Sequence, residues 1–212
     1  DFYAISAGKE HKAEFTNTEK QINSIYGAVS LSYADQLYLD LTGRNDWSST
    51  LPKANNSYFY PSVGASWIFS ETIGSLGPVS FGKLRASWAQ VGNDTDAYKL
   101  EDYYTLNYNL RDELMNVTRN DTRANPDLKH ETVQSVEAGL ELLFGNRLGV
   151  DVSWYKTNTF DQIIKLDIPP ATGYKFDLVN AGNVQNTGVE VALNATLVGA
   201  SNLTWESSIN WS

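Results

Sequence analysis

Residues Thr132–Thr157 constrain the fold most, because they predict two long β-strands joined by a tight turn. The turn is Gly145-Asn146, a dipeptide that suits a two-residue hairpin. Successive side chains of a strand point to opposite sides of a sheet, so alternate positions define its two faces. One face of the hairpin is apolar and carries Val136, Ala138, Leu140, Leu142, Phe144, Leu148, Val150, Val152 and Trp154. The other face is polar and includes Glu137, Glu141 and Asp151.

The same alternation recurs along most of the chain. A weak pattern over Asp1–Lys12 is compatible with a strand end. The predicted strands have about nine to fifteen residues, whereas strands of soluble proteins average roughly 5–6. Such lengths are typical of strands that cross an outer membrane. The further predicted strands are Ile22–Tyr33, Leu37–Arg44, Tyr58–Ser70, Lys83–Val91, Val184–Val198 and Leu203–Trp211.

The predicted connections alternate between short and long. In an up-and-down meander, alternate connections lie at the same end of the sheet, so one end collects the tight turns and the other the long loops, as in outer-membrane barrels. Glu71–Gly82 is the exception, being long for a turn, and a short helix is predicted near Arg111–Val117. Tight turns are predicted at Asp35, Gly145-Asn146 and Gly199–Asn202, and long loops at Asn45–Ser57, Gly92–Glu131 and Asn158–Asn183.

The composition excludes several classes of function. Sixteen basic against 25 acidic residues give a net charge of -9, which disfavours a nucleic-acid partner. There is no cysteine, and His11 and His130 have no recognisable triad or metal-ligand pattern, so neither an enzyme nor a cofactor is expected. The chain is rich in aromatic residues, and several of them lie on apolar faces near strand ends, where such rings meet a membrane interface. These are Phe59, Trp67, Phe69, Phe144, Trp154, Trp205 and Trp211.

These patterns predict an all-β fold, a transmembrane antiparallel up-and-down β-barrel that is only partly contained in residues 1–212. A soluble, extracellular β-sandwich acting as a carbohydrate-binding module would show the same alternation, since its two apolar faces meet in a core. A complete small barrel serving as an anchor is a further alternative, and it requires the first and last strands to pair.

Several segments resemble the barrel of SusC/RagA-type TonB-dependent outer-membrane transporters. Leu41–Phe69 matches a pattern G-R-x-D, then S-S, then F/Y-P-S-x-x-x-x-W, and Lys83–Asn93 is similar to K-L-R-x-S-x-x-x-x-G-N. Asn125–Glu131 resembles N-P-D-L-K-x-E, and Gly173–Val191 is similar to a stretch ending N-x-G-x-V-x-N-x-G-V-E. The motifs occur in family order over most of the chain.

The resemblance implies that the chain is about nine strands of a 22-stranded barrel, without the plug domain, the TonB-contacting segment and the last barrel strands. It implies nutrient import, of glycan or peptide, across the outer membrane of a Gram-negative bacterium of the Bacteroidetes type. The implied partners are a SusD-like surface lipoprotein, the TonB complex through regions absent here, an oligosaccharide or peptide substrate, and membrane lipid or lipopolysaccharide.

Three sets of residues are candidates for a functional site. The polar faces place six residues toward a hydrated lumen, where they either line a substrate path or, as we favour for each, form a bracing network: Tyr38, Arg44, Glu137, Glu141, Asp151 and Glu190. Tyr103, Tyr104 and Tyr108 lie in a long loop and are ligand candidates, because tyrosine offers a flat apolar ring and a hydroxyl. Asp94 and Asp96 offer oxygen ligands for Ca²⁺, although a solvated turn is the favoured interpretation.

Overall fold

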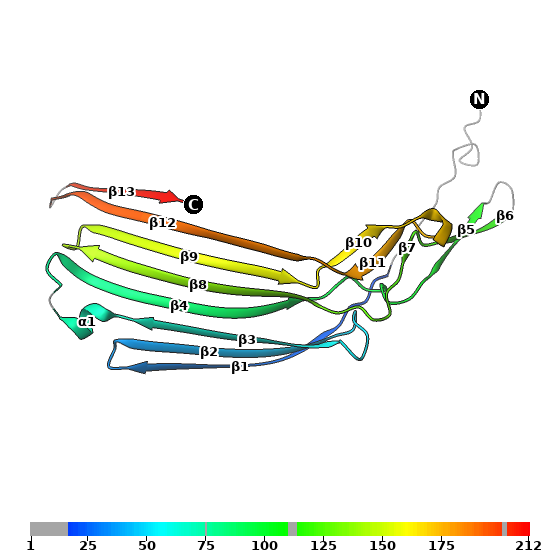
Figure 1. Cartoon of the computed structure of the whole chain (residues 1–212), viewed down its shortest axis with the longest axis horizontal. Coiled ribbons are helices and arrows are strands. Elements are labelled where there is room, and N and C mark those ends of the chain that lie inside the picture. The colour runs from blue at the N-terminus through cyan, green and yellow to red at the C-terminus, as the bar shows by residue number, and fades with distance from the viewer. Residues whose placement is uncertain (1–16, 75, 110–113, 201–202) are drawn as a thin grey trace, which may run out of the picture.

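Eight long strands form one antiparallel sheet whose order follows the chain (Figure 1). The computed structural model describes residues 17–74, 76–109, 114–200 and 203–212. Within these residues the sheet order is β1-β2-β3-β4-β8-β9-β12-β13, and its strands have 9 to 18 residues. The strands are β1 Ile22–Tyr33, β2 Leu37–Ser48, β3 Ser57–Trp67, β4 Val79–Asn93, β8 Glu131–Phe144, β9 Leu148–Phe160, β12 Asn183–Ala200 and β13 Leu203–Trp211.

The short connections lie at one end of this sheet. Between β1 and β2, Ala34 and Asp35 have φ of 54° and 53°, and between β8 and β9, Gly145 and Asn146 have φ of 53° and 56°. Two consecutive residues with positive φ are typical of type I′ turns, whose twist matches that of the flanking strands. The short helix α1, Phe69–Ile73, lies in the connection between β3 and β4 at this end (Figure 1). We call this end of the sheet the turn end.

The long connections lie at the opposite end, the loop end, and contain sheets of their own (Figure 1). Between β4 and β8, strands β5 (Tyr104–Asn109) and β6 (Leu114–Arg119) pair with each other, and β7 (Thr122–Arg123) follows. Between β9 and β12, β10 (Ile163–Asp167), the 3₁₀ helix η2 (Pro170–Thr172) and β11 (Phe176–Asn180) succeed one another. Strand β11 pairs antiparallel with β10 and parallel with β7, so the two long loops are joined.

Six sequence predictions need correction. Leu114–Val117, in the predicted helix, belong to strand β6. Phe69 lies in helix α1 rather than in a strand, and Val79–Gly82 already belong to β4. Residues 45–48 continue β2, because Asn45 and Asp46 pair with Phe59 and Tyr58 of β3. The predicted loop Asn158–Asn183 contains β10 and β11, and Gly92–Glu131 contains β5, β6 and β7. The predicted strand end Asp1–Lys12 and residues 111–113 of the predicted helix lie outside the residues that the structure describes.

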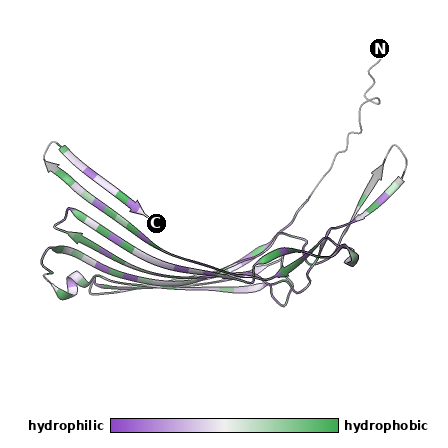
Figure 2. Ribbon diagram, turned by 45° about the horizontal axis from the view of Figure 1, so that its top comes forward, coloured by the Kyte–Doolittle hydropathy of each residue, from purple (hydrophilic) through white to green (hydrophobic). Residues whose placement is uncertain are grey.

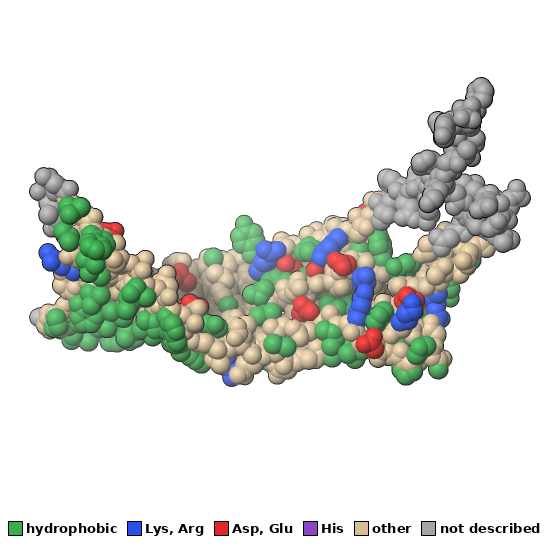
Figure 3. Space-filling model, turned by 90° about the horizontal axis from the view of Figure 1, so that it is seen from above, with side chains coloured by type: hydrophobic (Ala, Val, Ile, Leu, Met, Phe, Trp, Pro, Cys, Tyr) green, Lys and Arg blue, Asp and Glu red, His purple; other side chains and the backbone are tan. Residues whose placement is uncertain are grey.

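The apolar face of the sheet is uncovered. Ile25, Val29 and Leu31 of β1 and Trp205 and Ile209 of β13 are more than half exposed. Hydropathy alternates along each long strand (Figure 2), and apolar side chains gather along the convex outer side (Figure 3). In the described part of the chain no second sheet packs against this face, so the β-sandwich alternative is wrong. The small closed barrel is also wrong, since β1 and β13 are opposite edges of an open sheet.

A small core lies where the loops meet the sheet. It consists of Leu51, Tyr58, Leu128 and Leu178, which come from three connections and from β3, with Tyr60, Leu100 and Ile163 packed against it. Among the described residues, no helix is both long and apolar enough to span a membrane.

Candidate functional site

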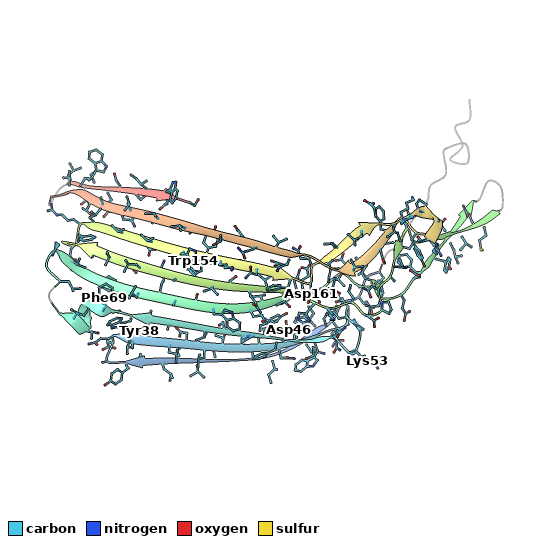
Figure 4. The ribbon with its side chains drawn as sticks, in the orientation of Figure 1. Tyr38, Asp46, Lys53, Phe69, Trp154 and Asp161 are labelled. Carbon is cyan, nitrogen blue, oxygen red and sulfur yellow. The ribbon has the colours of Figure 1, made fainter. Side chains whose placement is uncertain are left out.

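The strand register brings the six polar candidates to one face of the sheet. Tyr38 lies opposite Ser66, which lies opposite Arg85, and the row continues through Gly139 and Ser153 to Glu190. The other four candidates lie on the same face, since each is an even number of residues from a member of this row on its own strand. Figure 4 places Tyr38 toward the turn end and Asp46, on the same face of β2, at the loop end. We call this surface the polar face.

Arg85 is the centre of an ion-pair cluster on the polar face. Its Nη1 and Nη2 donate to the two carboxylate oxygens of Asp151, both at 2.7 Å. Nη2 also donates to Ser153 Oγ at 2.5 Å, and Nε lies 3.8 Å from Glu137 Oε1. Paired Arg–carboxylate bonds of this kind fix geometry as well as adding energy. Two of the six candidates, Glu137 and Asp151, therefore take part in a bracing network.

A second pair on this face lies near the loop end. Arg44 Nε donates to Asp46 Oδ1 at 2.7 Å, and its Nη2 donates to Ser24 Oγ at 3.1 Å. Asp46 is buried, so the partner charge offsets the cost of removing its carboxylate from water. The G-R-x-D motif is thereby explained as a pair of residues that lie on one face of β2.

Asp94, one of the two calcium candidates, is held by hydrogen bonds. Its Oδ1 accepts from Lys20 Nζ at 2.5 Å, and its Oδ2 accepts from the hydroxyls of Ser48 and Thr50. Burial alone would raise the pKa of Asp94, but the bonds from Lys20 and Ser48 outweigh it and hold the pKa below its ordinary value. No group of three or more acidic or histidine side chains suited to a metal occurs among the described residues. The Lys20 ammonium therefore supplies the positive charge next to this carboxylate.

The N-P-D-L-K-x-E motif forms the base of the loops. Leu128 is 0% exposed in the small core, and Asn55 Nδ2 donates to the carbonyl oxygens of Asp127 and Leu128 at 3.2 and 3.3 Å. Glu131 Oε1 accepts from the Ile163 backbone N–H at 2.8 Å, while its Oε2 accepts from Asn93 Nδ2 at 3.2 Å. The motif thus connects three loops to one another at the loop end of β4 and β8.

His130, inside that motif, stacks on Tyr58 with ring centroids 4.9 Å apart. Burial lowers its pKa, and the charge of Asp161 opposes this shift only in part. Its Nδ1 is buried without a hydrogen-bond partner. The neutral imidazole therefore acts as a packing group at the loop base.

Tyr103 and Tyr104, two of the three tyrosine candidates, lie in different surroundings. Tyr103 lines a cleft of about 590 Å³ at the loop end, whereas Tyr104 pairs with Arg119 in the β5–β6 hairpin. The Tyr108 side chain lies outside the described ones. Asp102, next to Tyr103, accepts from the Ala124 backbone N–H at 3.1 Å and from the Tyr174 hydroxyl. The Tyr174 hydrogen bond, more than that of Ala124, lowers the pKa of Asp102.

Sequence reasoning missed three features of these sites. Arg85 and Asp151 occur on strands that are distant in sequence, so their pairing follows only from the strand order. The bond between Asp102 and Tyr174 joins two long loops, and Arg119 lies over the Tyr174 ring at 3.8 Å. Tyr98, which also lines the cleft, carries no motif signal.

Comparisons with known proteins agree with this architecture. The family model described as TonB dependent receptor-like, beta-barrel, matches residues 2–212. TonB-dependent receptor P26 of Formosa agariphila is 34% identical over 89% of the chain, and TonB-dependent receptor SusC of Bacteroides thetaiotaomicron is 27% identical over 91%. A structure of the RagAB peptide transporter covers 90% of the chain with a TM-score of 0.80 and 27% identity. The chain spans about a fifth of the length of these proteins, 20% of each receptor and 21% of the RagAB chain. The chain therefore belongs to the TonB-dependent receptor-like β-barrel family and forms an open part of such a barrel.

Proposed function

We propose that this chain is part of the wall and the outer loops of a SusC-like nutrient importer in the outer membrane of a Gram-negative bacterium of the Bacteroidetes type. The observation that carries the proposal is a sheet of long strands with one uncovered apolar face and one polar face. The whole protein would transport its substrate without any bond chemistry.

The dimensions of the apolar face suit a bilayer. From Val136 to Phe144, β8 runs about 26 Å at ~3.3 Å per residue, close to the ~25 Å apolar band of outer-membrane barrels. On β9 the continuous row of apolar side chains ends at Trp154, since Lys156 and Asn158 follow on the same face before Phe160. Trp154 lies midway along β9 (Figure 4) rather than near its end as predicted, so the strand continues beyond the proposed lipid band. Lipid and lipopolysaccharide would contact this outer side.

The polar face would line the hydrated interior. The Arg85 cluster and the Arg44–Asp46 pair support a bracing role for Arg44, Glu137 and Asp151 in the wall. Tyr38, Glu141 and Glu190 share this face and would border the plug domain or the substrate path.

The names of the relatives support a peptide substrate and coupling to TonB. The RagAB structure is that of a peptide transporter, and the matched receptors are named as TonB-dependent. We propose uptake of a peptide or, as the sequence resemblance implies, of an oligosaccharide, powered by the TonB complex through parts of the protein outside this chain. A SusD-like surface lipoprotein would assist at the loop end.

Transport by the full-length protein tests this function. Deletion of the encoding gene should abolish uptake of one class of fluorescently labelled oligosaccharides or peptides, and the wild-type gene should restore it. The purified protein should bring a surface lipoprotein with it, and loss of the TonB complex should abolish uptake. Unchanged uptake of every tested oligosaccharide and peptide in the deletion strain would overturn the proposal.

A further inference from the structure

A groove crosses the apolar face of the sheet toward its turn end. Its floor is formed by alanines on three neighbouring strands, since Ala65 of β3 pairs with Ala86 of β4, and Ala86 pairs with Ala138 of β8. The groove has a volume of about 630 Å³ and extends over β1 and β2. Apolar side chains gather in this region on the convex side of the molecule (Figure 3). We call this feature the apolar groove.

Larger apolar side chains flank the alanine floor in the strand register. The next row toward the turn end contains Trp67 and Leu84, which pair with each other and line the groove. The next row toward the loop end contains Val63 and Trp88, which also pair with each other. An alanine side chain ends at Cβ, whereas leucine and tryptophan reach well beyond it. The floor is therefore lower than the rows on either side.

The wall of the apolar groove nearer the turn end is held in place by the protein itself. Trp67 Nε1 donates to Thr72 Oγ1 at 2.9 Å, and the Thr72 hydroxyl donates to Gln36 Oε1 at 2.8 Å. The Ile68 backbone N–H donates to the Gln36 carbonyl at 2.8 Å, and the Phe69 ring meets the Trp67 ring edge-on at 6.0 Å. A groove with a fixed wall needs little ordering when a ligand binds.

The dimensions of the apolar groove suit one acyl chain of one membrane leaflet. From β1 to β8 it crosses about 19 Å, four strand spacings of ~4.8 Å. Strands of outer-membrane barrels tilt by about 35–45°, so a row across them rises about 11–13 Å, half of the ~25 Å apolar band. The register has the same slope, because Leu39 is four residues from Asp35 in its turn, whereas Ala138 is seven residues from Gly145. The groove therefore starts near the turn end and rises into the bilayer.

The charged side chains at the turn end of the apolar groove are acidic. Asp35 in the β1–β2 turn and Glu71 in α1 are exposed, and neither segment, residues 34–36 and 69–73, contains lysine or arginine. The residues that follow them, Gln36 and Thr72, are hydrogen-bonded to each other, so the two segments lie together. Tyr33, which lines the groove, is 74% exposed beside them. Two carboxylates attract a headgroup that carries an ammonium group and repel a purely anionic one.

We infer that the apolar groove binds one acyl chain of a phosphatidylethanolamine molecule from the inner leaflet of the outer membrane, the leaflet at the short turns. The chain enters beside Tyr33 and lies over the three alanines, while the ammonium group lies at Asp35 and Glu71. The inference rests on the proposed function, because it requires the apolar face to meet lipid. It goes further in assigning one site to one class of lipid. A second copy of the protein seated on the groove is the competing outcome of the test.

Native mass spectrometry of the full-length protein in detergent tests the inference. The probes are phosphatidylethanolamine and phosphatidylglycerol with identical acyl chains. Ala86→Leu and, independently, Ala65→Leu fill the floor of the groove. Val189→Leu adds bulk to the same face on β12, outside the groove, and is the control. Asp35→Asn combined with Glu71→Gln removes both charges, and asparagine tolerates the φ of 53° at position 35.

The wild type should retain phosphatidylethanolamine more tightly than phosphatidylglycerol. Each alanine variant should weaken this binding roughly tenfold, the effect of displacing about two methylene groups of the chain. Val189→Leu should bind as the wild type does, and the double charge variant should bind both lipids equally. A phosphatidylethanolamine with a photoreactive group in its acyl chain should label peptides of β3 and β4.

Equal binding of the two lipids by the wild type, or labelling confined to other strands, would overturn the inference. So would protein dimers that both alanine variants disrupt while lipid binding stays unchanged. Heat-modifiable gel migration identifies any variant that fails to fold. Unchanged phosphatidylethanolamine binding in both alanine variants, together with uptake that is lost in the deletion strain, would reject the apolar groove and leave the proposed function standing.

Discussion

Arg85 and Asp151 are joined by two hydrogen bonds of 2.7 Å although their strands, β4 and β9, are not neighbours. Strand β8 lies between them, and the residue of β8 in the path is Gly139. The missing side chain makes room for the guanidinium group, which crosses the strand to reach Asp151. Three strands of the wall are therefore fixed relative to one another by one arginine.

Gly139→Ala should break this arrangement. A Cβ at position 139 would lie 2.5 Å from Arg85 Nε and 2.6 Å from its Cζ, so the guanidinium must move away. We expect a loss of about 1–2 kcal/mol, the scale of a bidentate ion pair with some added strain. Urea unfolding of the full-length protein in liposomes measures it. Gly64→Ala is the matched control, because a Cβ there has no atom within 4 Å; equal effects of the two variants would contradict the crossing role of Arg85.

Leu128→Ala should weaken the loop base strongly. Leu128 is 0% exposed, and truncation of a buried leucine costs roughly 2–5 kcal/mol. The wall would keep its membrane contacts, so we expect the loops to open first, which limited proteolysis detects as faster cleavage. Leu166→Ala, 44% exposed, should leave the cleavage rate unchanged. Equal rates for wild type and Leu128→Ala would contradict the proposed core.

His130 should make the loop base sensitive to mild acid. Its pKa is lowered in the folded protein, so the unfolded loops bind more protons between that value and ~6.5, the ordinary histidine pKa. Stability is therefore fully present above pH ~6.5 and falls as the pH decreases toward the folded pKa, by at most about 1.4 kcal/mol per pH unit. Hydrogen exchange of the loop amides at pH 7.5 and pH 5.5 measures this loss.

His130→Phe keeps a ring against Tyr58 and removes the titrating group. The pH dependence should then be absent from the loop amides. Persistence of the same dependence in this variant would assign it to another residue. Asp94 does not account for it, because its lowered pKa places its titration below the ordinary aspartate value of ~4.

Calcium should not stabilise the loop end through Asp94. The Lys20 ammonium and two hydroxyls already bind its carboxylate. We expect chelation of divalent cations to leave the exchange of the loop amides near Asp94 unchanged, and Lys20→Met to speed it. Faster exchange upon chelation, reversed by Ca²⁺ and absent from Asp94→Asn, would restore the calcium interpretation.

The eight long strands are predictable from sequence, because a strand with one apolar and one polar face shows strict alternation. Ile22–Tyr33 and Leu203–Trp211 have the predicted bounds. Beyond the apolar band both faces of a strand carry polar residues, so the alternation ends while the strand continues. For this reason Asn45–Ser48 were predicted as loop although they pair with β3.

The candidate sites also differ in how far they can be predicted from the sequence. The polar face is predictable, since alternation assigns each side chain to one side without knowledge of its neighbours. Arg85–Asp151, Asp102–Tyr174 and the Asp94 network depend on strand order and on contacts between loops distant in sequence. No local pattern encodes such contacts, and the strained Tyr98 has no sequence signature either.

If the apolar face of the sheet meets lipid and the polar face meets water, consecutive residues of one strand must differ in their surroundings. Val189 and Glu190 are consecutive residues of β12 on opposite faces, and the chain has no native cysteine. Spin labels at Val189→Cys and Glu190→Cys of the full-length protein in liposomes report their surroundings through collisions with oxygen, which enters lipid, and with a water-soluble nickel chelate. We predict that oxygen dominates at position 189 and the nickel chelate at position 190. The reverse pattern, or equal access at both positions, would contradict this placement of the two faces.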